Sequence, residues 1–117
     1  MQGLKIMIAG PSDFLPETVR QAWLSAGIEL LGPFPVASID RNQALHSNGV
    51  VIDISESPDG VFALSENLET WHVPFLYALP EGSYSARTGP YILNDVADDI
   101  QAIVNSLLSD YDIGVRH

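Results

Sequence analysis

The sequence is poor in two kinds of residue, cysteine and the basic residues, and each shortage excludes classes of site and partner. Without cysteine the chain can form no disulfide, no thiolate metal site and no cysteine nucleophile. Five lysine and arginine residues stand against 15 aspartate and glutamate residues, which gives a formal net charge of -10. A negative potential repels nucleic-acid phosphates and anionic lipid headgroups, so we expect no direct contact with nucleic acid or membrane. A basic protein surface remains open as a partner.

Long apolar runs are also missing, because no stretch approaches the ~18 consecutive apolar residues of a membrane-spanning helix. The first residues, 1–5, lead directly into an apolar strand pattern without a basic leader or a cleavage site, which predicts a soluble, cytoplasmic protein. The 117 residues, 46% of them hydrophobic, are enough for one compact domain with its own core. We expect the core of this single domain at about 4–109 and a tail at 110–117.

Short apolar runs alternate along the chain with segments of helical periodicity. Residues 50–54 are the most strand-like, because they are β-branched and apolar on both faces, with Asp53 as their one charge. Asp13 and Ser38 are expected to cap helices, and residues 79–90 hold too many glycines and prolines for a stable helix. The predicted strands are 4–9, 28–31, 50–54, 73–78 and 91–93, and the predicted helices are about 14–26, 39–47, 61–70 and 96–108.

Strands that alternate with helices predict an α/β fold with parallel pairing through right-handed crossovers. Five strands at this length favour a flavodoxin-like three-layer sandwich, with a five-stranded parallel sheet in the order 2-1-3-4-5. In such a sheet a site lies at the carboxyl ends of strands one, three and four. Those ends are residues 9–13, 53–58 and 78–82.

Asp53 needs an explanation, because a carboxylate near the end of a central apolar strand must reach solvent, a partner or a metal. In order and spacing, residues 4–109 resemble the receiver domains of response regulators. The likeness is carried by Lys-Ile-Met-Ile at 5–8, by Val-Val-Ile-Asp at 50–53 before a Pro-Asp-Gly loop, and by Tyr91 on strand five. The resemblance implies that Asp53 occupies the phosphoacceptor position. The residues themselves also allow a structural interpretation, in which Asp53 caps the loop that follows it.

Several residues depart from the receiver pattern at the positions that carry its chemistry. Phosphoryl transfer to a carboxylate relies on Mg²⁺ held by oxygen ligands, which in this family come from an acidic pair after strand one. Gly10 and Pro11 stand at those positions, with Asp13 just beyond them. Leu79 stands where a hydroxyl residue is expected at the end of strand four, and Asn94 stands where a lysine is expected after strand five.

Two further departures concern the loops. Pro58 follows Asp53 one residue later than in the family's usual Asp-x-x-x-Pro spacing. The family's fourth helix, which helps to form the output and dimer surface, is expected to be short or missing at 79–90. These departures predict altered loop geometry and altered signal readout.

Together these residues predict a degenerate receiver, or pseudo-receiver, that is not efficiently phosphorylated and acts in signal transduction through protein–protein contact. The expected partner is a second copy of the chain, a histidine kinase or another regulator, and we expect no enzymatic activity and no cofactor. One alternative is a receiver that accepts phosphate at Asp53 through an unusual Mg²⁺ site that includes Asp13. Another is a domain that binds a small ligand in the cleft at the strand ends.

The candidate cleft residues are those at the carboxyl ends of the strands and just after them, namely Gly10, Pro11, Ser12, Asp13, Leu79 and Asn94, beside Asp53. A metal site is not predicted from the histidines. His46, His72 and His117 are not spaced to place two imidazoles on one helix face, and no cysteine assists them.

Overall fold

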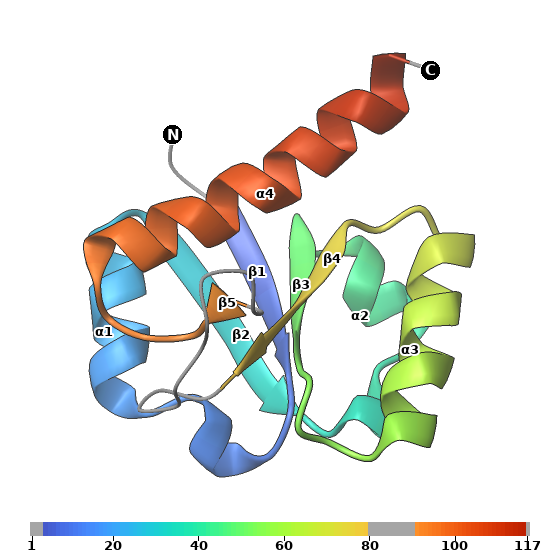
Figure 1. Ribbon diagram of the computed structural model, residues 1–117, viewed down its shortest axis with the longest axis horizontal. Helices are drawn as coiled ribbons and strands as arrows, with labels where there is room; N and C mark the ends of the chain where they lie inside the picture. Colours follow the sequence, from blue (N-terminus) through green and yellow to red (C-terminus); the bar gives the residue numbers. More distant parts are fainter. Residues whose placement is uncertain (1–3, 80–90, 117) are drawn as a thin grey trace.

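The computed structural model describes residues 4–79 and 91–116, with side chains up to Leu108. Strands and helices alternate along the chain (Figure 1). The strands are β1 (Leu4–Ala9), β2 (Ile28–Phe34), β3 (Gly49–Asp53), β4 (Phe75–Leu79) and β5 (Tyr91–Ile92). The α-helices are α1 (Glu17–Ser25), α2 (Arg41–Leu45), α3 (Pro58–Thr70) and α4 (Ala97–Arg116), and the 3-10 turns are η1 (Ser12–Phe14) and η2 (Val36–Ser38).

The five strands form one parallel sheet in the order β2-β1-β3-β4-β5. This is the flavodoxin-like α/β fold with the strand order predicted from the sequence. The register places Ala9 beside Ile52, and Asp53 beside Ala78. The carboxyl ends of β1, β3 and β4 therefore meet at one edge of the sheet, where ligand sites of this fold class lie.

Side chains of alternate strand residues pack into two separate cores, one on each face of the sheet. Ile6, Ile8 and Val51 face α1 and α4. Met7 and the residues directly before and after Val51 in β3 face α2 and α3. Figure 1 shows the same arrangement, with α1 and α4 on one side of the sheet and α2 and α3 on the other. Burial on both faces explains why β1 and β3 are continuous apolar runs.

The edge strand β2 is covered by the side chain of Arg20 from α1. Its Nη1 donates a hydrogen bond of 2.7 Å to the carbonyl of Leu30, and its Nη2 donates to the carbonyl of Gly32. Carbonyl groups of an edge strand have no neighbouring strand to bind on their outer side. The planar guanidinium satisfies two of them at once.

Two helices begin later than predicted. Asp13 lies in η1 and does not cap α1, which starts at Glu17 behind Pro16, because a proline disfavours helical backbone in the residue before it. Helix α2 is capped by Asp40 and not by Ser38. The backbone N–H of Gln43 donates to Asp40 at 2.8 Å, and Gln43 Oε1 accepts from the N–H of Asp40 at 3.0 Å, so this capping box satisfies two orphan donors.

The last helix also differs from the prediction. Residues 110–116, expected as part of a tail, continue α4 to Arg116, and the end of the helix extends beyond the sheet (Figure 1). This stretch contains no proline, and adding residues to an existing helix is far easier than starting one. Apart from Leu79, the loop predicted at 79–90 lies outside the described residues, and so does the prediction of a short or missing helix there. None of the helices in the described part of the chain is long and apolar enough to cross a membrane.

Candidate functional site

Asp53 is the last residue of β3 and is almost fully buried, with 2% of its surface exposed. Its Oδ1 accepts two hydrogen bonds from Ser55, one of 2.9 Å from the backbone N–H and one of 2.6 Å from the hydroxyl. The carbonyl of Asp53 accepts another from the N–H of Glu56 at 3.1 Å. These contacts form the loop-capping arrangement that the structural interpretation predicts for an aspartate at a strand end.

Gly10 lies against Asp53 at the end of β1. A Cβ atom built on Gly10 would lie 3.0 Å from the Cβ of Asp53 and 2.9 Å from Cδ2 of Phe14. Phe14 is fully buried in the core on the α1 and α4 face of the sheet. An aromatic ring therefore fills the space beside the strand end, where a receiver would carry its acidic pair, and any side chain larger than hydrogen at Gly10 would collide with it.

Pro11, Ser12 and Asp13 are exposed to solvent in and before the turn η1. The turn is closed by a backbone hydrogen bond of 3.0 Å from the N–H of Phe14 to the carbonyl of Pro11, without a side-chain cap. Asp13 thus sits in solvent while Asp53 is buried. Of the four residues 10–13, Gly10 is the one for which the structure shows contact with Asp53.

Leu79 and Asn94 take structural roles at the other end of the site. The carbonyl of Leu79 accepts a hydrogen bond of 2.9 Å from the N–H of Leu93, which extends the pairing of β4 with β5. The side chain of Asn94 is turned toward α4. Its Oδ1 accepts from the N–H of Val96 at 3.0 Å, and its Nδ2 donates to Asp99 at 2.7 Å.

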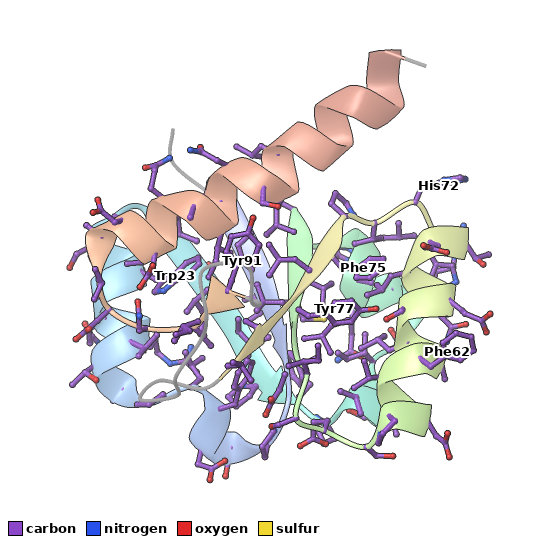
Figure 2. All side chains as sticks on the ribbon, in the orientation of Figure 1. Trp23, Phe62, His72, Phe75, Tyr77 and Tyr91 are labelled. Carbon is purple, nitrogen blue, oxygen red and sulfur yellow. The ribbon has the colours of Figure 1, made fainter. Side chains whose placement is uncertain are left out.

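The backbone of Asn94 is bound as well, because its carbonyl accepts a hydrogen bond of 3.0 Å from the indole N–H of Trp23. Trp23 lies in α1 (Figure 2) and is fully buried. Asn94 therefore links α1 to α4. A neutral amide held in this way supplies no cation toward Asp53.

Metal ligands do not gather in residues 4–79 and 91–108. Within these ranges no group of three or more histidine, aspartate or glutamate side chains could hold a metal ion. His46 and His72 are both exposed, and Nδ1 of His46, which follows α2, lies 2.6 Å from the carbonyl of Asn42 in that helix. His117 lies outside the described residues.

A surface groove of about 350 Å³ lies between the sheet and α2. Met7, Leu31 and Phe34 form its apolar part, and Asn42, Gln43 and His46 form its polar part. None of these residues was predicted as a site residue. The groove is therefore separate from the strand-end cleft that the small-ligand alternative requires.

Two residues at the strand ends were not predicted from the sequence. An aspartate followed two residues later by a serine is a pattern typical of a hydrogen-bonded turn, and this signal could have identified Ser55 from the sequence. Phe14 gives no comparable signal, because its contact with Gly10 depends on how η1 folds back over β1. Together Phe14, Gly10, Asp53 and Ser55 form a packed and hydrogen-bonded strand end.

No protein-family model matches the chain, and a search of curated proteins found no match. The function is therefore inferred from the geometry of the strand ends and from the family resemblance of the sequence.

Proposed function

We propose that this chain is a degenerate receiver domain that works in signal transduction by binding another protein and is not efficiently phosphorylated. The observation that carries the proposal is the state of Asp53, which lies at the phosphoacceptor position of the resemblance. The carboxylate is buried, and its Oδ1 is bound by both the N–H and the hydroxyl of Ser55. Both lone pairs of that oxygen are engaged, so an attack through it must give up at least one of these hydrogen bonds.

The neighbouring positions support the same proposal. Transfer of a phosphoryl group to a carboxylate needs positive charge to offset the charge that develops on the phosphoryl oxygens. Gly10 is packed between Phe14 and Asp53 and offers no side-chain ligand for Mg²⁺, while the side chain of Asn94 is bound to α4. The activity of such a domain would then reside in its surfaces, with no enzymatic chemistry and no cofactor.

The partner in this proposal is a protein, either a second copy of the chain or a kinase or regulator of the same pathway. The acidic charge supports a protein partner over nucleic acid. A cytoplasmic location belongs to the same proposal, because receiver-type signalling takes place there. Light scattering and affinity capture test this part, since a strictly monomeric protein without any protein partner would contradict it.

Phosphodonor chemistry tests the central claim. We expect that incubation with Mg²⁺ and acetyl phosphate leaves the intact mass unchanged, and that Mg²⁺ with beryllofluoride leaves the amide resonances of Asp53 and its neighbours unshifted. The Asp53→Asn variant is the matched control, because it retains an oxygen acceptor for Ser55 but cannot form an acyl phosphate. An adduct on the natural protein that is lost in Asp53→Asn would overturn the proposal in favour of a phosphorylatable receiver.

A further inference from the structure

The outer face of α3 carries an exposed aromatic side chain. Phe62 is 63% exposed, the largest fraction among the large hydrophobic side chains that the structure describes as exposed. It lies on the opposite side of the molecule from Trp23 (Figure 2). The opposite face of the same helix is buried against the sheet through Val61, Leu64 and Leu68, so Phe62 takes no part in the core.

Carboxylates surround Phe62 on this face. Asp59, Glu66 and Glu69 are all exposed, and they lie three residues before Phe62 and four and seven residues after it. Residues at these spacings share one side of a helix. Phe62 is therefore the apolar centre of an acidic helix face, which we call the Phe62 face, made of Asp59, Phe62, Glu66 and Glu69.

Asp59 lies in the first turn of α3, where the helix dipole favours an anion, but the other two charges of the Phe62 face do not stabilise the helix. Glu66 and Glu69 are like charges at a spacing of three residues, and Glu69 lies in the last turn, where the helix dipole disfavours an anion. The helix itself contains no lysine or arginine. In the ranges that the structure describes, the ion pair found is the 3.9 Å contact of Arg20 with Glu17, both in α1.

We propose that the Phe62 face docks an arginine-containing, basic segment of a protein partner. The guanidinium group of arginine stacks on an aromatic ring and also forms paired hydrogen bonds with carboxylates. The Phe62 face offers both on one side of one helix. Such a segment would offset the repulsion between Glu66 and Glu69 and cover the exposed ring. The inference rests on the proposed function, for which it names a surface and a class of partner.

A titration with designed peptides tests this surface in the full chain. The probes are a short amphipathic helical peptide of leucine and arginine, the same peptide with lysine for arginine, and the same peptide with glutamate. We expect the arginine peptide to bind more tightly than the lysine peptide, and the glutamate peptide not to bind. Amide chemical shifts of the ¹⁵N-labelled protein should change most at 59–69.

Substitutions separate this surface from general attraction between opposite charges. Phe62→Ala should weaken binding of the arginine peptide about tenfold, as the loss of an interface anchor does. Glu66→Gln should weaken it less and reduce its dependence on salt. The matched controls are Leu24→Ala and Glu29→Gln, which alter an exposed apolar residue of α1 and an exposed acid of β2 and should leave the affinity unchanged.

Three outcomes would overturn the inference. They are unchanged affinity in a folded Phe62→Ala variant, shifts that map to another face, and no binding of either basic peptide. Folding of each variant is checked by its thermal midpoint. A protein partner that binds through another face would contradict the role of the Phe62 face but would agree with the proposed function. Phosphorylation of Asp53 would contradict the proposed function and would not alter the peptide result.

Discussion

Gly10 and Asp53 approach each other so closely that a Cβ atom on Gly10 would lie 3.0 Å from the Cβ of Asp53. The contact joins the ends of β1 and β3, two neighbouring strands whose carboxyl ends lie at the candidate site. It also explains why a glycine stands where the resemblance implies an acidic residue. The ring of Phe14 fills the space beside Gly10, so an acidic side chain in place of Gly10 would force this ring to move.

Substitution of Gly10 should therefore destabilise the fold without building a metal site. We predict that Gly10→Ala lowers the free energy of unfolding by about 1–3 kcal/mol, because the added methyl group overpacks Phe14 and Asp53. Gly10→Asp should cost more, since it also brings a second carboxylate beside a buried one. Urea unfolding followed by tryptophan fluorescence measures both changes, with and without Mg²⁺.

Gly60→Ala is the control for the two Gly10 variants. Its added methyl group lies 3.1 Å from the side chain of Val36, and the substitution raises the helix propensity of α3. It should cost less than Gly10→Ala. A Gly10→Asp variant of unchanged stability that is further stabilised by Mg²⁺ would show that the strand end can hold the ion after all.

The hydroxyl of Ser55 should hold the carboxylate of Asp53 in place. We predict that Ser55→Ala lowers the free energy of unfolding by about 1 kcal/mol, because it removes the 2.6 Å hydrogen bond to a charged, buried acceptor. Ser57→Ala is the matched control, since Ser57 makes no side-chain cap for α3. Its effect should stay within about 0.5 kcal/mol, as for most surface substitutions. Equal effects of the two variants would contradict the role given to Ser55.

The sheet could be predicted from the sequence because its signals are local. The apolar, β-branched residues of 50–52 indicate a strand buried on both faces, and the alternation with helices then leads to the parallel order. The place of Asp53 at the end of β3 follows from the same pattern. Helix starts were harder, since Pro16 and Asp40 decide them through backbone restriction and capping and not through periodicity.

The contacts that the site residues make could not be predicted in the same way. Asn94 is bound to Trp23 from a helix far earlier in the chain, and Phe14 reaches Gly10 only after η1 has folded over β1. Such contacts depend on tertiary packing and leave no periodic signal in the sequence. The bond from Ser55 to Asp53 is different, because its short spacing makes it detectable from sequence.

Arg20 should contribute to stability through the edge of the sheet. We predict that Arg20→Lys lowers the free energy of unfolding by about 1–2 kcal/mol, since a single ammonium group cannot replace the two-pronged contact with the carbonyls of Leu30 and Gly32. Arg41→Lys, at an exposed position of α2, is the control and should have little effect. Urea unfolding measures both. Equal stability of Arg20→Lys and the natural protein would mean that water satisfies these carbonyls equally well.

The bond between Trp23 and Asn94 gives the last prediction, because it ties the connection between β5 and α4 to α1. We predict that Trp23→Phe lowers the free energy of unfolding by about 2–4 kcal/mol. The substitution leaves a cavity in a fully buried position, and it removes the donor to the Asn94 carbonyl. Trp71, which is half-buried, remains as the fluorescent probe of unfolding in this variant.

Trp71→Phe is the matched control, with Trp23 as its probe, and should cost less because Trp71 is only partly buried against the α2 and α3 core. Hydrogen exchange adds a local test of the same bond. In Trp23→Phe the amide of Val96, which donates to the Asn94 side chain, should exchange faster, since the residue that holds it has lost its anchor. If Trp23→Phe shows the predicted loss of stability but the exchange rate of the Val96 amide is unchanged, the effect of Trp23 is due to packing alone.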